Sequence, residues 1–252
     1  MKKNLMALGV ATSCLMMSAA SAQAFTFKTN TVGNGPTGDI LLESVEIGNT
    51  VITDFVLVNG AEIETAPFFN DEFTGDNTGA ASSDDTVDGT KGLTEEKPGN
   101  ADIVASLGNE YLSSIVDTED NGSFRMQLSF DGVFNKLLFW ERGHNSDLEV
   151  TINNVTKKLF RTDFDQGITN YKLETTEITP NEQEVGSYGI DLAHFGITGK
   201  YSGPVILSTE SAFNGPDFKV VGVAVPEPAT MLGLGVVAGA GFLASRRKRA
   251  EA

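Results

Sequence analysis

The C-terminal tail of this sequence cannot belong to a globular domain. It runs from Val225, Pro226, Glu227 and Pro228 through 17 uncharged residues (229–245) to a basic cluster of Arg246, Arg247, Lys248 and Arg249. A helix that crosses a bilayer needs ~17–25 apolar residues, and a basic cluster tends to stay in the cytoplasm. The sequence therefore predicts a sorting segment at 225–252, with a transmembrane helix over 229–245, a basic membrane stop, and a folded domain upstream on the outer side.

The order of a Pro-Glu-Pro signal, a short apolar span and a basic stop resembles the C-terminal sorting signal of PEP-CTERM proteins. The resemblance implies that an exosortase cuts the chain near Pro226–Pro228 and passes it to the cell surface. The two prolines fit this role, because they lack backbone N–H groups and keep their neighbours extended. A plain single-pass anchor without processing is the alternative.

The N-terminus has the pattern of a cleaved secretory leader. Two lysines precede an apolar stretch over 5–17, and Ala22 and Ala24 supply the small residues that signal peptidase accepts before Phe25. We therefore expect a signal peptide at 1–24. Cys14 would suit a lipoprotein, but the residue three positions before it is Ala11, where such a signal normally has Leu.

Without its two ends, the chain keeps 12 basic and 32 acidic residues and a net charge near −20. Such a domain, over 25–224, repels nucleic acid and anionic lipid and attracts divalent cations. The only cysteine lies in the leader, so the mature domain can form no disulfide.

The periodicity of the domain is that of β-strands. Residues 40–47 and 51–58 flank a Gly48-Asn49 turn and predict a hairpin. Further strands are expected at 124–130, 136–140, 148–152, 158–160, 171–173, 189–192, 205–208 and 218–223. Many short strands separated by turns predict a mainly β fold, a single antiparallel β-sandwich of jelly-roll type. Only 101–107, with Asn100 as N-cap, is expected to be helical.

Two acidic segments could bind calcium. The long loop over 67–98 is rich in Asp, Glu, Gly, Ser and Thr, and is either a solvated loop or a cation site. Asp117, Glu119 and Asn121, followed by Gly122, match the first half of an EF-hand loop. The second half fails, because Leu128 occupies the position of the bidentate Glu. A simple acidic turn before the strand at 124 is the other interpretation.

The enzyme signals are weak, and no other cofactor is indicated. No zinc spacing and no Gly-x-Ser-x-Gly elbow occur. Trp140, Arg142 and His144 form a candidate ligand site at the end of a strand, although Arg142 could instead be buried and paired with Glu141 or Asp147. His194 is expected to pack at a strand end. A glycosidase could use any two of the 34 acidic residues, but no pattern points to a pair.

The body of the chain resembles a family of cyanobacterial exosortase-dependent surface proteins. The resemblance is carried by the segments 37–45, 55–61, 77–83, 138–143 (Leu-Phe-Trp-Glu-Arg-Gly) and 213–217. It implies surface sorting and an extracellular-matrix role, and it supplies no catalytic residue. We therefore expect a non-enzymatic, exported surface or matrix protein. The alternatives are a module that binds exopolysaccharide by stacking on Trp140, Tyr188 or Tyr201, and a secreted glycan hydrolase.

Overall fold

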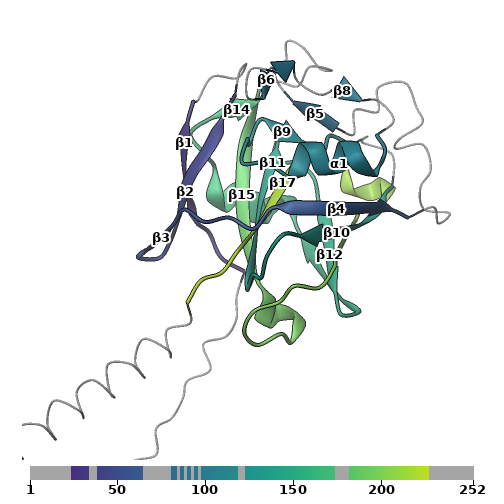
Figure 1. Ribbon diagram of the computed structural model, residues 1–252. Coiled ribbons are helices and arrows are strands. Elements are labelled where there is room, and N and C mark those ends of the chain that lie inside the picture. Colours follow the sequence, from purple (N-terminus) through teal and green to yellow (C-terminus); the bar gives the residue numbers. More distant parts are fainter. Residues whose placement is uncertain are drawn as a thin grey trace, which may run out of the picture.

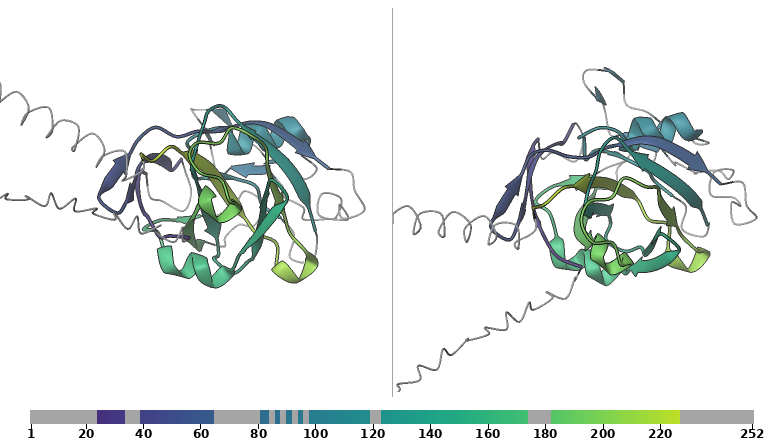
Figure 2. Two further views of the ribbon diagram at one scale, coloured as in Figure 1. Left: turned by 90° about the horizontal axis from the view of Figure 1, so that it is seen from below. Right: turned by 60° about the horizontal axis from the view of Figure 1, so that its bottom comes forward.

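The computed structural model describes residues 24–33, 39–64, 81–83, 86–87, 90–91, 94–95, 98–118, 123–173 and 182–226. The leader up to residue 23 and the predicted membrane helix lie outside these residues. Among the residues that are described, no helix is long and apolar enough to cross a membrane. The chain forms antiparallel sheets stacked in layers, with short helices at their margins (Figures 1 and 2).

The central layer is a four-stranded antiparallel sheet. Its order is β14 (Lys172–Leu173), β15 (Gln183–Asp191), β11 (Lys136–Arg142) and β17 (Phe218–Val223). Every residue of β11 after Lys136 is buried, and all of β17 is buried. Successive residues of a strand point to opposite faces of the sheet. Because residues on both faces of β11 and β17 are buried, this sheet must lie between two other layers.

The second layer is a five-stranded sheet that covers one face of the central sheet. Its order is β13 (Val155–Leu159), β12 (Leu148–Ile152), β16 (Val205–Ser208), β10 (Arg125–Phe130) and β4 (Val58–Ile63). Leu128 and Val150 from this sheet pack with Phe139 and Phe218 from the central one. These two sheets form the expected sandwich.

The third layer is a small sheet on the other face of the central sheet. It consists of β1 (Lys28–Val32), β2 (Leu41–Ile47) and β3 (Thr50–Ile52). Phe27 and Leu42 pack there with Leu138, Trp140 and Val221, in a second core. Successive residues of a strand point to opposite faces, so β11 sends Phe139 into the first core and both of its neighbours into the second.

Short elements complete the fold. The helices are α1 (Asn100–Leu107), α2 (Arg161–Phe164), η2 (Asp165–Gly167), η3 (Leu192–Phe195) and η4 (Ser211–Phe213). The remaining strands are β5 (Ala81–Ser83), β6 (Thr86–Val87), β7 (Thr90–Lys91), β8 (Thr94–Glu95) and β9 (Ser114–Ile115). The described parts of the acidic segment predicted as a loop over 67–98 therefore include four short strands.

The mainly β, antiparallel prediction is confirmed, and so is the hairpin at Gly48-Asn49, since β2 pairs with β3. Several local expectations are wrong. The strand expected at 51–58 is interrupted, since β3 ends at Ile52 and β4 begins at Val58, and α2 forms a second helix where none was expected. The N-cap of α1 is Gly99, whose N–H donates to the Asp102 carboxylate at 2.7 Å, and Asn100 is helical. The strand expected at 189–192 begins earlier, at Gln183, and ends at Asp191, so that Leu192 is the first residue of η3.

Candidate functional site

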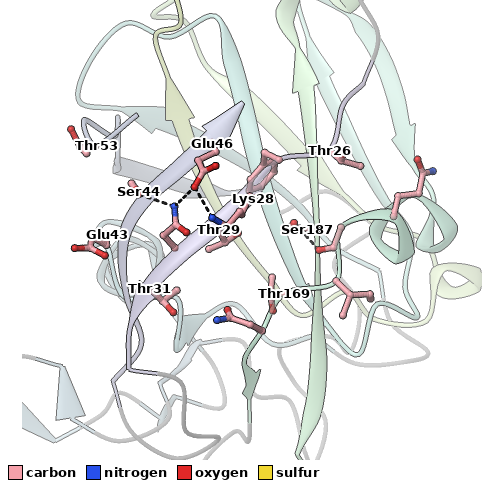
Figure 3. A pocket seen from close by; sticks show the side chains of 16 residues that line it. Thr26, Lys28, Thr29, Thr31, Glu43, Ser44, Glu46, Thr53, Thr169 and Ser187 are labelled. Carbon is pink, nitrogen blue, oxygen red and sulfur yellow. Dashed lines mark hydrogen bonds and ion pairs between the residues drawn. The ribbon is translucent and has the colours of Figure 1, made fainter. Parts of the chain in front are cut away.

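A groove of about 940 Å³ opens between β1 and the segment 166–170 (Figure 3). Sixteen residues line it, of which seven carry a hydroxyl and three a carboxamide. Its charged side chains are Lys28, Glu43 and Glu46, and its apolar ones are Phe27 and Ile168. The groove is therefore a polar, hydrogen-bonding surface rather than an apolar pocket.

The groove exists because β1 separates from the central sheet. Phe25 pairs with Gly189 of β15 through two backbone hydrogen bonds of 2.8 Å. Glycine at 189 lets the Phe25 ring lie directly on β15, since an added Cβ would collide with that ring unless it moved. Three residues further on, from Lys28, the chain pairs with β2 instead. A wedge therefore opens between β1 and Ser187, which lies on β15 two residues before Gly189.

Trp140 supports the groove from below. Its indole N–H donates to the Thr29 hydroxyl at 2.9 Å, and its ring meets that of Phe27 edge to face, with centroids 5.2 Å apart. Both Phe27 and Thr29 line the groove, whereas Trp140 is 1% exposed. Trp140 thus holds two lining residues in place and is itself out of reach of a ligand.

One wall carries a hydrogen-bonded network on β1 and β2. Glu46 accepts from Lys28 at 2.7 Å and from the Asn30 amide at 3.1 Å, and that amide also donates to the Ser44 hydroxyl at 3.0 Å. The bond from Lys28 lowers the pKa of Glu46. The register shifts after Asn30, so that Glu43 is left unpaired in the ladder and lines the groove. A β-bulge of this kind changes the direction in which a side chain points.

The opposite wall, 166–170, is fastened to β15. The Ser187 hydroxyl donates to the Gly167 carbonyl at 2.8 Å, and the Thr169 N–H donates to the Val185 carbonyl at 2.9 Å. Residue 167 must be glycine, because an added Cβ would collide with the Ser187 carbonyl. Both walls are therefore fixed by bonds within the protein (Figure 3).

Arg142 is buried, as one interpretation of the sequence expected, but its partner is neither Glu141 nor Asp147. Its guanidinium donates to the Asp217 carboxylate at 3.0 Å and to the Leu173 carbonyl at 3.2 Å. Asp147 instead pairs with Lys158 at 2.8 Å. The side chain is 1% exposed, so Arg142 cannot reach a ligand in this structure.

Glu141 is a fully buried acid beside this ion pair. Burial raises its pKa well above the ordinary value, and the negative charge of Asp217 adds to the shift. The Ser146 hydroxyl and the backbone N–H groups of Asn145 and Asp217 lie nearby and lower the pKa, which opposes this shift in part. However, within the described part of the chain neither carboxyl oxygen has a partner in hydrogen-bond geometry. The geometry therefore favours the neutral, protonated carboxyl.

His144 lies on the surface, next to two acids. Its Nδ1 is 2.5 Å from the Asp165 carboxylate, and its Nε2 is 3.8 Å from that of Glu184. Its backbone has φ of 40°, which is unusual for a residue other than glycine. Of the three residues proposed as a ligand site, only this one is partly exposed. His194 lies on η3, where its Nε2 is buried and has no partner among the described residues.

The three aromatic residues proposed as a stacking platform do not form one. Trp140 is buried, and Tyr188 is 9% exposed with its ring against Phe164. The Tyr201 ring meets Phe134 edge to face at 5.9 Å, and its hydroxyl donates to the Pro204 carbonyl at 3.0 Å. Stacking of a sugar ring needs an open aromatic face, so sugar binding to this domain would have to use hydrogen bonds from other side chains.

The proposed calcium turn is only partly described. Glu119 and Asn121 lie outside the described residues. Asp117 is 5% exposed and lies beside Asp217, where it lowers the pKa of the Asp217 carboxyl against the opposing effect of burial. The following N–H, of Thr118, donates to Asp217 at 3.1 Å. No group of three His, Cys, Asp or Glu residues that could hold a metal occurs among the residues described.

The folded domain ends directly at the sorting signal. The Asn135 side chain donates to the Val225 carbonyl at 2.7 Å and accepts from the Val225 N–H at 2.9 Å. Val225 also packs against the second core. The last described residue is Pro226, which is exposed. The Pro-Glu-Pro signal therefore begins at the surface of the domain, with no spacer after β17 beyond Ala224 and Val225.

Comparison with known proteins identifies the tail. The family model of the PEP-CTERM protein-sorting motif matches residues 224–248. No curated protein and no solved structure matches the chain. The match includes the Val-Pro-Glu-Pro segment, the apolar span and most of the basic cluster, as the sequence predicted. The chain is a PEP-CTERM protein, exported and sorted to the cell surface by way of an exosortase.

Proposed function

We propose that the domain over 25–224 is a non-enzymatic component of the cell surface or the extracellular matrix. The observation that supports the proposal is that polar and charged side chains which could serve a ligand or a reaction instead make contacts within the fold. Trp140 supports Thr29, Arg142 pairs with Asp217, and Asp147 holds Lys158. The first two of these contacts join segments 111 and 75 positions apart in the sequence, and the third holds the β12–β13 hairpin, which suits a protein whose purpose is a stable displayed surface.

The two ends of the domain fit export with processing at both sides. Cleavage by signal peptidase before Phe25 would leave Phe25 as the first residue, and it is bonded to Gly189. At the other end, exosortase would act just beyond Val225, which Asn135 holds. Both cuts would thus fall at the border of the folded domain, and transient anchoring by 229–245 would precede release.

Fractionation of cells tests this function. We expect the wild-type protein in the matrix or surface fraction, and the variant with Pro226, Glu227 and Pro228 replaced by Ala in the inner membrane. Cells without the protein should lose matrix cohesion, measured as the shear needed to disperse them. A wild-type protein that stays in the membrane fraction would contradict the proposal. Release of reducing ends from exopolysaccharide by the purified domain would instead indicate a glycan hydrolase.

A further inference from the structure

The groove beside β1 contains hydroxyl groups that are nearly buried and still have hydrogen-bonding capacity. Thr29 is 9% exposed, Ser44 is 8% exposed and Ser187 is 1% exposed. Thr29 accepts a bond from Trp140, and Ser44 accepts one from Asn30. A hydroxyl can accept and also donate, and in the described part of the chain neither of these two protons has an acceptor. Ser187 donates to Gly167 and is out of reach of a ligand, whereas the partly exposed Thr31 donates to the Gly33 carbonyl at 3.0 Å and can still accept.

These groups are held in place before any ligand arrives. Thr29 is fixed by Trp140, Ser44 by the Asn30 and Glu46 network, and Ser187 by the turn at Gly167. A ligand that meets ordered side chains does not have to order them, so less affinity is lost on binding. Phe27 and the 46% exposed Ile168 add apolar surface for the C–H groups of a polar ligand.

The charge of the groove limits the ligand. Lys28 and Glu46 neutralise each other, which leaves one carboxylate, Glu43, in a domain whose net charge is near −20. An anionic polymer would be repelled. The volume of about 940 Å³ falls within the ~300–1,000 Å³ range of ligand sites. A ligand rich in hydroxyl groups and without charge satisfies all of these conditions.

We propose that this groove binds a neutral segment of a polysaccharide chain. Hydroxyls of the sugar accept from Thr29 and Ser44 and donate to Thr31, and one ring edge rests on Phe27 or Ile168. The inference rests on the proposed matrix function and names its ligand. An extended peptide that pairs with β1 is the competing occupant. It is less favoured, because strand addition draws its specificity from pockets for alternate side chains, and the groove has only two apolar residues.

Co-sedimentation with the exopolysaccharide extracted from the producing cells tests the proposal on the mature domain. The test variant is Thr31→Val with Ser44→Ala, which removes two hydroxyls of the groove. The matched control is Thr50→Val with Ser129→Ala, which removes two hydroxyls at exposed positions outside it. We expect about ten-fold weaker binding by the test variant and unchanged binding by the control. Thermal melts of both variants show whether each is folded.

A second variant, Thr169→Trp, fills the groove from the opposite wall and should abolish binding without altering β1 or β2. Neutral hexasaccharides and an alginate hexamer, added as competitors, report the charge preference, and a (Thr-Val)₃ peptide reports strand addition. The proposal is overturned if the exopolysaccharide does not bind, if the alginate hexamer competes best, if the peptide alone competes, or if Thr169→Trp binds normally. None of these outcomes affects the fractionation experiment, which tests the matrix function independently.

Discussion

The side chain of Asn135 holds the backbone of Val225 by two hydrogen bonds, one donated to its carbonyl and one accepted from its N–H. Asn135 precedes β11 in the central sheet, and Val225 is the first residue of the Val-Pro-Glu-Pro segment. One amide thus connects the core of the domain to its sorting signal. The contact fixes the residue before Pro226, while Pro226 itself stays exposed.

Replacing Asn135 by Ala should release the end of the domain. Each hydrogen bond is worth about 0.5–1.5 kcal/mol, so the free energy of unfolding should fall by about 1–3 kcal/mol. The Val225 amide should exchange with deuterium about ten-fold faster or more. Asn135→Asp keeps the acceptor and loses the donor, so its stability and its exchange rate at Val225 should lie between those of the wild type and Asn135→Ala. Asn59→Ala, at an exposed position of β4, is the control. Unchanged exchange at Val225 in Asn135→Ala would show that the clamp has no effect.

Processing of the tail can be read from the mass of the native protein. We expect a mature C-terminus near Pro226–Pro228 and no trace of residues 231–252. Replacing Glu227 and both prolines by Ala should leave an unprocessed precursor in the membrane, because the exosortase signal is gone. Glu251→Ala, beyond the signal, should be processed normally. If most of the surface protein kept its basic cluster in cells that have the exosortase, the tail would be an ordinary anchor.

The strands that pair with near neighbours could be predicted from the sequence, whereas the contacts of the candidate sites could not. The hairpin at Gly48-Asn49 and the turn at Asn153-Asn154, where both residues have positive φ, depend on local residue types. By contrast, Trp140 meets Thr29 across 111 positions. Periodicity carries no information on such pairings. The continuous apolar run of β11 was a signal for a layer on each of its faces.

The interpretation of Arg142 shows the same limit. Burial was one interpretation of the charged residues at the end of the expected strand, and the acids next to Arg142 in the sequence were the expected partners. The actual partner, Asp217, is 75 positions away and comes into reach only because β17 pairs with β11. The groove was missed for a related reason. Four of its seven hydroxyls lie on β1, β2 and β15 and three on connecting segments, and the alternating Thr and Asn residues of β1 were a local signal for it.

Asp117 is expected to act through its buried contact rather than through calcium. Desolvation raises the pKa of the neighbouring Asp217, and the side chain of Asp117 opposes this shift. Asp117→Asn should therefore lower the melting temperature equally in millimolar calcium and in chelator, at fixed ionic strength. A calcium ion present at 100 times its dissociation constant would stabilise the domain by ~2.7 kcal/mol. A melt that depends on calcium, and loses that dependence in Asp117→Ala with Glu119→Ala, would identify a calcium site.

The pH dependence of stability should report the buried acid Glu141. Burial raises its pKa above the 4.5 of the unfolded chain, and the charge of Asp217 raises it further. Between these two pKa values the folded protein binds more protons than the unfolded chain, so stability is greatest below about pH 4.5 and falls as pH rises toward the folded pKa. Each unit of difference costs ~1.4 kcal/mol once the pH exceeds both values.

Glu141→Gln removes this titration and keeps the shape of the side chain. We expect the melting temperature of the variant to match that of the wild type near pH 4 and to exceed it by a margin that grows toward pH 8. Glu62→Gln, which removes an exposed acid on β4, controls for the loss of one negative charge. Asp147→Asn should behave in the opposite way: although burial opposes it, the bonds from Lys158 and Arg161 lower the pKa of Asp147. Its loss should therefore destabilise the protein at neutral pH, with the difference disappearing as the pH falls below about 4. A constant difference between Glu141→Gln and wild type from pH 4 to pH 8 would mean that Glu141 does not titrate in this range.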